Sequence, residues 1–306
     1  MPDRRAPRTN AVPPVVPSST GFAERELPRL CALLAERGID SVELSGNIAP
    51  LADEILNETL AHWAGQIAFY VHNYFPPPAV PFVLNLAHPD TVARSVQHCR
   101  HAIDLCATFG VGVYSIHAGL SFNPHPRNLG RDQAHLEPLP MGDSRAVLMA
   151  ACRDVAVYAR DKGVRLLLEN NVVAPYNAPE GRNIRYHMAD PTEAASLLPL
   201  FEEGAVGWML DTGHLKVSAR TLGFDPADFL ALFAPYIEAV QLSDNDGTTD
   251  QNHPVTKDSW FWPAIPWRQA AYVSLEVCGE TPAAMTDQIA LTRALVGNFI
   301  HADNRD

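Results

Sequence analysis

The sequence predicts a single α/β domain, an eight-stranded parallel (β/α)₈ barrel. Short apolar runs rich in β-branched residues alternate with longer segments of helical period along the 306 residues. Long loops rich in Pro, Gly and Asn follow several of these runs, as expected where barrel loops build a binding face. Such a barrel needs roughly 250 residues, so the chain is long enough for one barrel with extended loops.

Eight runs are predicted as strands. Most are apolar along their whole length, which is typical of parallel strands that are buried on both faces. The first run has the weakest pattern. In chain order the runs cover residues 11–17, 39–44, 67–72, 111–117, 164–170, 205–211, 237–242 and 271–277.

The segments between these runs have helical periodicity. After the third strand, apolar residues follow a 4-3-4-3 spacing that lines one helix face: Val92, Val96, Cys99, Ile103 and Cys106. Asp90 or Thr91 is a suitable N-cap for this helix, and Gly110 suits its end. Residues 146–163 repeat this design, and Asp190 precedes a proline at a further helix start.

Three connections are longer than simple turns: residues 73–89, 118–141 and 171–190. Each follows the carboxyl end of a predicted strand. Since these ends all open at one face of a barrel, the three segments should form the rim of the binding site.

The charge balance disfavours a nucleic-acid partner. The chain has 23 Lys and Arg against 35 Asp and Glu, a formal net charge of −12, whereas nucleic-acid binding requires basic residues to neutralise phosphates. No apolar run approaches the ~20 residues that span a bilayer. We therefore expect a small-molecule substrate and no membrane partner.

The cysteines and the N-terminus favour a cytoplasmic protein. Five cysteines are an odd number, and they form no C-x-x-C pair, which is typical of a reduced chain. The first ten residues are charged and no apolar segment follows them, so a secretory signal is not expected. We predict a disordered tail at residues 1–10 and one barrel domain at residues 11–306.

Ionisable or amide side chains follow the apolar runs at six consecutive strand ends. In a parallel barrel these side chains would meet in one mouth. In chain order they are His72, His117, Glu169, Asp211 with His214 just after it, Gln241 with Asp244 just after it, and Glu276.

Glu169, Asp211 and Glu276 predict a metal site. Carboxylates held together at low dielectric repel one another strongly, and a divalent cation removes that repulsion. Oxygen ligands favour Mn²⁺ or Mg²⁺, while added imidazoles would favour Co²⁺ or Zn²⁺.

The ordered set of strand-end motifs resembles a known superfamily. The motifs are H-N-Y-F-P-P-P, I-H-A-G, L-L-L-E-N, D-T-G-H, Q-L-S-D-N-D-G and S-L-E-V. Together they resemble the xylose-isomerase-like TIM-barrel superfamily over nearly the whole chain. That superfamily holds sugar-phosphate isomerases and epimerases, ketose 3-epimerases, inosose dehydratases and endonuclease IV.

The resemblance implies a ligand set. Matching motif to motif with the ketose epimerases gives Glu169, Asp211, Gln241 and Glu276 as metal ligands. Gln241 stands where those enzymes usually have a histidine, and an amide oxygen is a weaker, neutral ligand. His214 and His253 are alternative sources of an imidazole.

The resemblance to endonuclease IV is less complete. His72, His117 and His214 match positions of its three-metal site. Gln241 stands in place of one of its metal ligands. The segment from Asp250 to His253 is one residue too long for the Asp-x-His pair of that site. Together with the acidic charge balance, this disfavours DNA repair.

The resemblance also implies a reaction, proton transfer at a carbon beside a carbonyl, through an enediolate. Glu169 and Glu276 would be the catalytic acid and base, on opposite sides of a carbohydrate-like substrate. Candidate substrate-binding residues are His214, His72, His117, Asn170, Arg182, Arg185, Asp244 and His253. Homodimers and homotetramers occur among such barrels.

Each candidate also has a structural alternative. The structural alternative for His72 and His117 is that of buried core histidines. For Gln241 it is that of a core amide whose hydrogen bonds are satisfied. The sequence around Asp244 suits a turn, and Arg182 and Arg185 suit the solvated surface of a loop.

Three other functions remain open. One is a metal-dependent lyase, a dehydratase of the inosose or dehydroshikimate type. Another is a phosphodiester hydrolase related to endonuclease IV. The last is a non-catalytic barrel that has lost its metal.

Overall fold

The computed structural model describes residues 11–302, and the predicted tail at residues 1–10 lies outside them. Eight parallel strands form one sheet in the order β1-β8-β7-β6-β5-β4-β3-β2. The strands are β1 (Val15–Pro17), β2 (Ser41–Leu44), β3 (Ala68–His72), β4 (Val113–His117), β5 (Arg165–Glu169), β6 (Gly207–Asp211), β7 (Ile237–Leu242) and β8 (Tyr272–Leu275).

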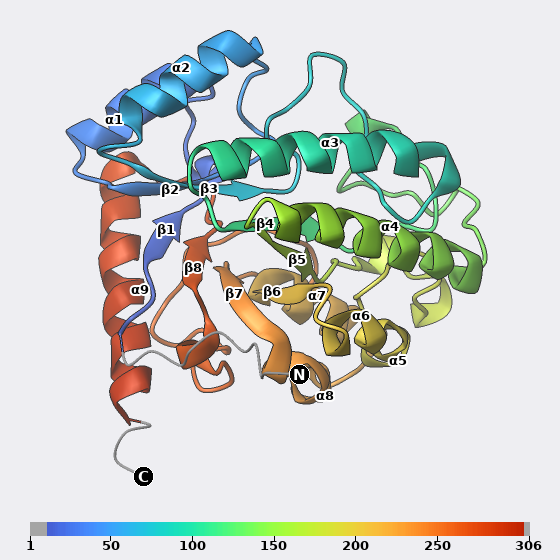
Figure 1. Ribbon diagram of the computed structural model, residues 1–306. Helices are drawn as coiled ribbons and strands as arrows, with labels where there is room; N and C mark the ends of the chain where they lie inside the picture. The colour runs from blue at the N-terminus through green and yellow to red at the C-terminus, as the bar shows by residue number, and fades with distance from the viewer. Residues whose placement is uncertain (1–10, 303–306) are drawn as a thin grey trace.

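The sheet curls into a nearly closed barrel (Figure 1). β1 pairs with β8, and a single parallel bridge between Ser18 and Glu43 brings the end of β1 to β2. The predicted (β/α)₈ fold is therefore confirmed. Each observed strand falls inside its predicted run, because the flanking apolar residues belong to the turns that enter or leave the barrel.

The helices surround the barrel on its outside. They are α1 (Leu27–Glu36), α2 (Asp53–Trp63), α3 (Pro89–Thr108), α4 (Met141–Asp161), α5 (Pro191–Ala194), α6 (Leu198–Glu202), α7 (Thr212–Leu222), α8 (Pro226–Phe233) and α9 (Pro282–Ala302). Figure 1 shows α3 and α4 side by side across one face and α9 beside β1. Their apolar faces and the outward faces of the strands share one buried core.

Two predicted helix starts can be compared with the structure. The predicted start at Asp190 is confirmed, and the Asp190 carboxylate caps α5 by accepting a hydrogen bond from the Glu193 N–H. The prediction of Asp90 or Thr91 for α3 was wrong. His88 is the cap, because its ring nitrogen Nδ1 accepts from the Asp90 N–H at 3.2 Å.

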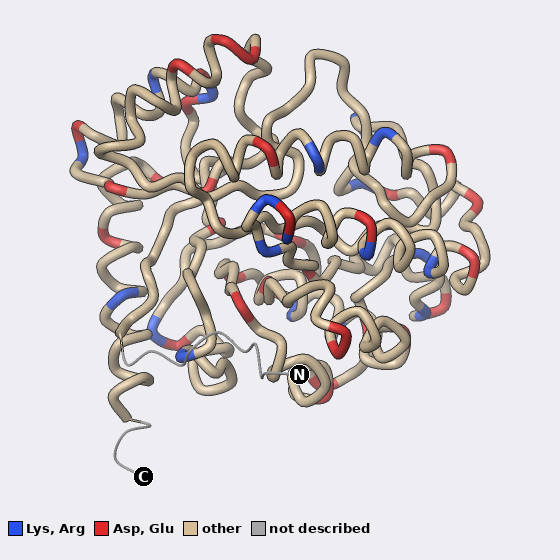
Figure 2. The backbone as a smooth tube through the Cα atoms, viewed as in Figure 1, with Lys and Arg blue, Asp and Glu red and all other residues tan. Residues whose placement is uncertain are grey.

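The charges lie mainly outside the barrel. Figure 2 shows basic and acidic positions interspersed along the outer helices, including α3 and α4. Several form exposed pairs between neighbouring helices, such as Arg100 with Asp154 at 2.9 Å. Within residues 11–302, no helix combines the length and the apolar character needed to cross a membrane.

Candidate active site

Polar side chains inside the barrel lie directly above an apolar floor. Side chains two residues apart on a strand point to the same side. Glu169, Asp211 and Gln241 each follow a floor residue at this spacing, and all three are 0% exposed. The floor is one buried cluster made of Val16, Leu167, Met209, Ala239 and Tyr272.

Glu169 lies at the centre of three imidazoles. His214 Nδ1 lies 3.1 Å from its Oε1 atom, and His117 Nδ1 lies 3.5 Å from the same atom. His72 Nε2 lies 3.4 Å from Oε2. The structure thus brings four of the predicted site residues together, from β3, β4, β5 and the start of α7.

These residues form two groups with the spacing of metal ligands. His72, His117 and Glu169 form one group, and Glu169, Asp211 and His214 form the other. Within each group one ligand atom per residue lies within 4.8 Å of the others. Glu169 belongs to both, so any cation in either group would contact the same carboxylate.

The buried polar atoms of this cluster fit a divalent cation. Both carboxylate oxygens of Glu169 are buried without a hydrogen-bond partner, and so are Asp211 Oδ2, Gln241 Oε1 and His117 Nδ1. A buried polar atom without a partner is costly. These orphaned atoms are the oxygen and nitrogen types that bind hard or borderline divalent ions.

The carboxylates of the cluster hold their protons unusually tightly. Burial raises the pKa of Glu169 to about 8 and that of Asp211 to about 6. Loss of solvation, together with the charges of Asp211, Asp250 and Glu169, raises the pKa of Glu276 well above its usual range. A divalent cation would favour the ionised form of all of them.

The three histidines differ in charge. Burial lowers the pKa of His72 to about 3 and places that of His117 well below its usual range, so both rings are neutral. Burial also acts to lower the pKa of His214. The charges of Asp211 and Asp250 outweigh burial and raise the His214 pKa well above its usual range. His72 and His117 therefore have lone pairs available for a metal, whereas His214 is a cation.

Asp211 and His214 are held by the junction of β6 and α7. Asp211 is the N-cap of α7 and accepts a hydrogen bond of 2.6 Å from the His214 N–H. The Asn170 side chain accepts from the Asp211 N–H and donates to the Asp211 carbonyl, both at 2.9 Å. His214 Nδ1 lies 2.9 Å from the Asn170 carbonyl oxygen. The predicted substrate ligand Asn170 thus ties β5 to β6.

Gln241 and Glu276 complete the predicted ligand set on β7 and just after β8. Gln241 Nε2 donates to Glu43 at 3.5 Å, which leaves Gln241 Oε1 as the orphaned atom. Glu276 is partly exposed, and its Oε1 accepts from the Thr20 hydroxyl at 3.4 Å. Its pKa responds to Glu169 and Asp211, although it lies outside both compact groups.

The two predicted arginines have other partners. Arg182 forms an exposed ion pair with Glu180 at 2.8 Å. Arg185 is 4% exposed, and its guanidinium donates to the carbonyls of Leu136 and Ala134. Arg185 therefore joins the loop after β5 to the loop after β4, and a role for either arginine in substrate binding stays a prediction.

Asp244 and His253 meet through their backbones. Each N–H donates to the other carbonyl, at 2.8 and 2.9 Å. The Asp244 carboxylate accepts from Lys216 at 2.6 Å and Ser259 at 2.7 Å, while the His253 side chain is exposed. Asp244 thus fixes the loop after β7, and the substrate contacts predicted for both residues remain untested.

Two acids of this site are outside the set predicted from the sequence. Glu43 is 0% exposed inside the barrel, and a lone acid in the apolar run Ser-Val-Glu-Leu was the signal for it. Asp250 places Oδ2 3.3 Å from His214 Nε2. Its position depends on the path of the loop after β7, which periodicity does not encode.

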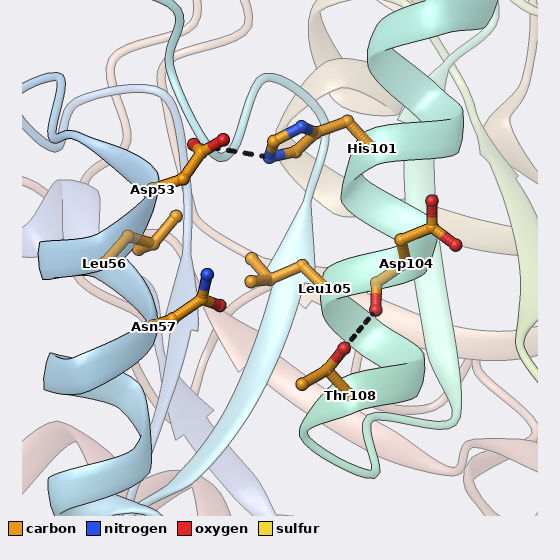
Figure 3. Close-up of a pocket in the computed structure, with 7 residues that line it drawn as sticks. All are labelled: Asp53, Leu56, Asn57, His101, Asp104, Leu105 and Thr108. Atoms are coloured by element: carbon orange, nitrogen blue, oxygen red, sulfur yellow. Dashed lines mark hydrogen bonds and ion pairs between the residues drawn. The ribbon is translucent and has the colours of Figure 1, made fainter.

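Surface hollows lie away from this cluster. Figure 3 shows a pocket between α2 and α3, in which His101 faces Asp53. Its volume is about 160 Å³, and His101 Nε2 lies 3.9 Å from Asp53 Oδ1. A second hollow has a volume of about 490 Å³. It is lined by residues 81–83, by Asp90, Thr91 and Arg94, and by residues 123–126. Neither hollow contains a predicted site residue.

The architecture is shared with solved sugar epimerases. A D-tagatose 3-epimerase-like protein is 17% identical, with a TM-score of 0.63 over 93% of this chain and 98% of that one. An L-ribulose 3-epimerase is also 17% identical, with a TM-score of 0.62 over 96% of each chain. At these identities the likeness concerns the fold.

A further solved structure carries a metal. The xylose isomerase-like TIM barrel protein from Mycobacterium smegmatis, in complex with magnesium, is 14% identical, with a TM-score of 0.62 over 94% of this chain and 97% of that one. No curated protein matches the sequence. The family model of the xylose isomerase-like TIM barrel matches residues 31–271, more than half of the chain. The chain therefore belongs to the xylose isomerase-like TIM barrel family.

Proposed function

We propose that the protein is a divalent-metal-dependent isomerase or epimerase of a small sugar or sugar phosphate. The observation that carries the proposal is the buried cluster of Glu169, Asp211 and His214 at adjacent strand ends, in a chain of this family. The sugar epimerases among the solved neighbours support the same reaction class.

Glu169, Asp211, Gln241 and Glu276 would hold the cation. Their orphaned or tightly protonated oxygens support this assignment. A bound divalent ion supplies Lewis acidity and compensates the carboxylate charges. Oxygen donors favour Mn²⁺ or Mg²⁺, and imidazoles from His72 or His117 would shift the preference toward Co²⁺ or Zn²⁺.

Two carboxylates would move the proton. Glu169 and Glu276 come from β5 and from the end of β8, so they can approach a substrate from different sides. One removes a proton from the carbon beside the carbonyl, and the other returns a proton to the neighbouring position or to the opposite face. A raised pKa suits a carboxylate that must both take and give a proton near neutral pH.

The surrounding groups would orient the substrate. The His214 imidazolium can donate to a substrate hydroxyl or carbonyl oxygen, because Asp211 and Asp250 keep it charged. The apolar floor below Glu169 excludes water from one side of the reacting carbon. The acidic charge balance supports a carbohydrate-like substrate over a nucleic acid.

Solvent-deuterium incorporation tests the proposal. The metal-loaded protein is incubated in D₂O with a panel of ketoses, ketose phosphates and inososes, and the products are analysed by mass spectrometry. Deuterium at a single carbon without loss of water supports an isomerase or epimerase, whereas loss of water supports the dehydratase. Absence of exchange with every substrate would remove the support for proton transfer.

One observation favours a second candidate, a metal-dependent phosphodiester hydrolase. His72, His117 and Glu169 form a group that can hold an additional ion. Two or three Zn²⁺ ions per chain, together with cleavage of a phosphodiester substrate, would favour this candidate. A single ion per chain would favour the isomerase.

A further inference from the structure

Glu43 is a buried acid that the proposed reaction does not use. It lies in the middle of β2, is 0% exposed, and faces the inside of the barrel. Burial raises its pKa to about 7. A carboxyl group in such a place needs hydrogen-bond partners, because a buried acid without them is strongly destabilising.

Two residues of β8 hold the Glu43 carboxyl in place. The Ser274 hydroxyl donates to Oε1 at 2.7 Å, and the Tyr272 hydroxyl donates to Oε2 at 3.0 Å. Both donors are buried, and the Tyr272 ring packs on Tyr70 with the ring centres 4.4 Å apart. The carboxyl group therefore has little freedom to turn.

The third partner of Glu43 is Gln241. Its side-chain nitrogen Nε2 donates to Glu43 Oε1 at 3.5 Å. The two ends of an amide differ, because the nitrogen only donates and the oxygen only accepts. With the nitrogen turned to Glu43, the oxygen Oε1 is turned away from it, and Oε1 is buried without a hydrogen-bond partner.

The register of the sheet places the Gln241 side chain beside a proposed metal ligand. Gln241 is the partner of Asp211 across β6 and β7, and the partner of Ser274 across β7 and β8. Partners in register project to the same face. The Gln241 side chain therefore lies between a proposed ligand, Asp211, and a residue that anchors Glu43.

We propose that Glu43 is a positioning residue that aims the amide oxygen of Gln241, and not its nitrogen, at the divalent cation. The inference rests on the proposed metal-dependent function. An amide is neutral and has similar size at both ends, so its orientation needs an external partner. Glu43 supplies that partner, because its Oε1 atom accepts from the amide nitrogen.

Metal affinity of the purified full chain tests this role. Apo protein is prepared with a chelator and titrated with Mn²⁺, by calorimetry and by electron paramagnetic resonance of free Mn²⁺. Glu43→Gln keeps the size of the side chain and removes its charge. We expect Mn²⁺ affinity to fall by about 10- to 100-fold, the usual effect of losing such a supporting group.

A matched control is available elsewhere in the barrel. Glu193 is also a largely buried carboxylate, and it contacts His187 Nδ1 and the Met188 N–H, both at 2.7 Å. Glu193→Gln changes a comparable network without contact to Gln241. We expect this variant to bind Mn²⁺ as the wild type does, even where its thermal stability falls.

A double-mutant cycle separates positioning from a general charge effect. If Glu43 acts through Gln241, adding Glu43→Gln to Gln241→Ala changes affinity by no more than about twofold, the error of additivity. Equal losses in both backgrounds would overturn the proposal. A carboxylate has two equivalent oxygens and needs no such orientation, so the exchange variant Glu43→Gln with Gln241→Glu should lose no more than about twofold in Mn²⁺ affinity relative to Gln241→Glu alone.

The outcomes distinguish this inference from the proposed function. If the wild type binds no divalent ion, the metal-dependent function fails and the role of Glu43 fails with it. If the wild type binds Mn²⁺ and Glu43→Gln binds it equally well, the role of Glu43 alone is overturned. Should Glu43→Gln not fold, the exchange variant decides, since a clear loss of Mn²⁺ affinity relative to Gln241→Glu alone would contradict the proposal.

Discussion

The ring nitrogen Nδ1 of His214 lies 3.1 Å from Glu169 Oε1, so a charged imidazole contacts the most central carboxylate of the barrel. Asp211 Oδ1 lies 3.8 Å from the same nitrogen, and Asp250 Oδ2 lies 3.3 Å from the other ring nitrogen, Nε2. These acids keep the pKa of His214 well above its usual range, so the charged ring compensates them. A divalent ion bound here would also compensate the charges of these carboxylates.

We therefore expect His214→Gln to destabilise the metal-free protein. Removing one partner of a buried ion pair costs about 3–5 kcal/mol. Urea unfolding in the presence of a chelator measures the loss. Adding Mn²⁺ at about 100 times its Kd should restore about 2.7 kcal/mol. His253→Gln, at an exposed histidine, is the control, and equal stability of the two variants would contradict this explanation.

Metal affinity should increase with pH. The pKa is raised to about 8 for Glu169 and to about 6 for Asp211, so Glu169 is largely protonated at neutral pH, and Asp211 also takes up a proton as the pH falls to 6. A metal must displace those protons, which makes binding weaker at pH 6 than at pH 8 and nearly constant above the higher pKa. Calorimetry in two buffers of different ionisation enthalpy should detect proton release at pH 6.5. Affinity that is flat from pH 6 to 8 would be incompatible with these raised pKa values.

Glu169→Gln should abolish most of the proton transfer. The amide cannot accept the substrate proton, and loss of a general base lowers the rate by about 10²- to 10⁴-fold. Solvent-deuterium incorporation into the substrate measures this rate at saturating metal. Glu180→Gln removes an exposed carboxylate that pairs with Arg182 and should leave the rate unchanged. A Glu169→Gln variant that exchanges deuterium at the wild-type rate would remove Glu169 from the reaction.

The fold was predictable because its signals are local. Runs of apolar β-branched residues predict strands, and the residue that ends each run must lie at the mouth of a parallel barrel. Glu169 and Asp211 were identified in this way, and the structure brings them together with His214. The cap of α3 escaped prediction, since histidine is an uncommon N-cap and only geometry shows that His88 accepts the bond.

The rest of the site depends on contacts between distant segments. Asp250 meets His214 through a loop whose path no periodicity encodes. Arg185 looks like an anion-binding residue in the sequence, yet two of its guanidinium nitrogens donate to backbone carbonyls of another loop. Glu43 lies inside the barrel, and its hydrogen-bond donors are Tyr272 and Ser274, more than two hundred residues later in the chain. A lone acid in a short strand does not reveal these partners.

Asn170 offers a last test, because its side chain connects two strand ends beneath the carboxylates. It accepts from the Asp211 N–H at 2.9 Å and the Trp208 indole N–H at 3.2 Å, and donates to the Asp211 carbonyl at 2.9 Å. Asn170→Ala should cost about 1–3 kcal/mol for each buried group left unpaired. It should also weaken Mn²⁺ binding, because Asp211 loses the bonds that fix its backbone.

The neighbouring Asn171 is the matched control for that experiment. It is also buried, and it donates to the carbonyls of Gly119 and His187 at 2.9 Å, away from Asp211. Asn171→Ala should lower the free energy of unfolding in chelator by a similar amount while Mn²⁺ affinity stays at the wild-type value. If the two variants lose Mn²⁺ affinity equally, the loss reflects general destabilisation of the loop after β5. Asn170 would then have no specific role in positioning Asp211.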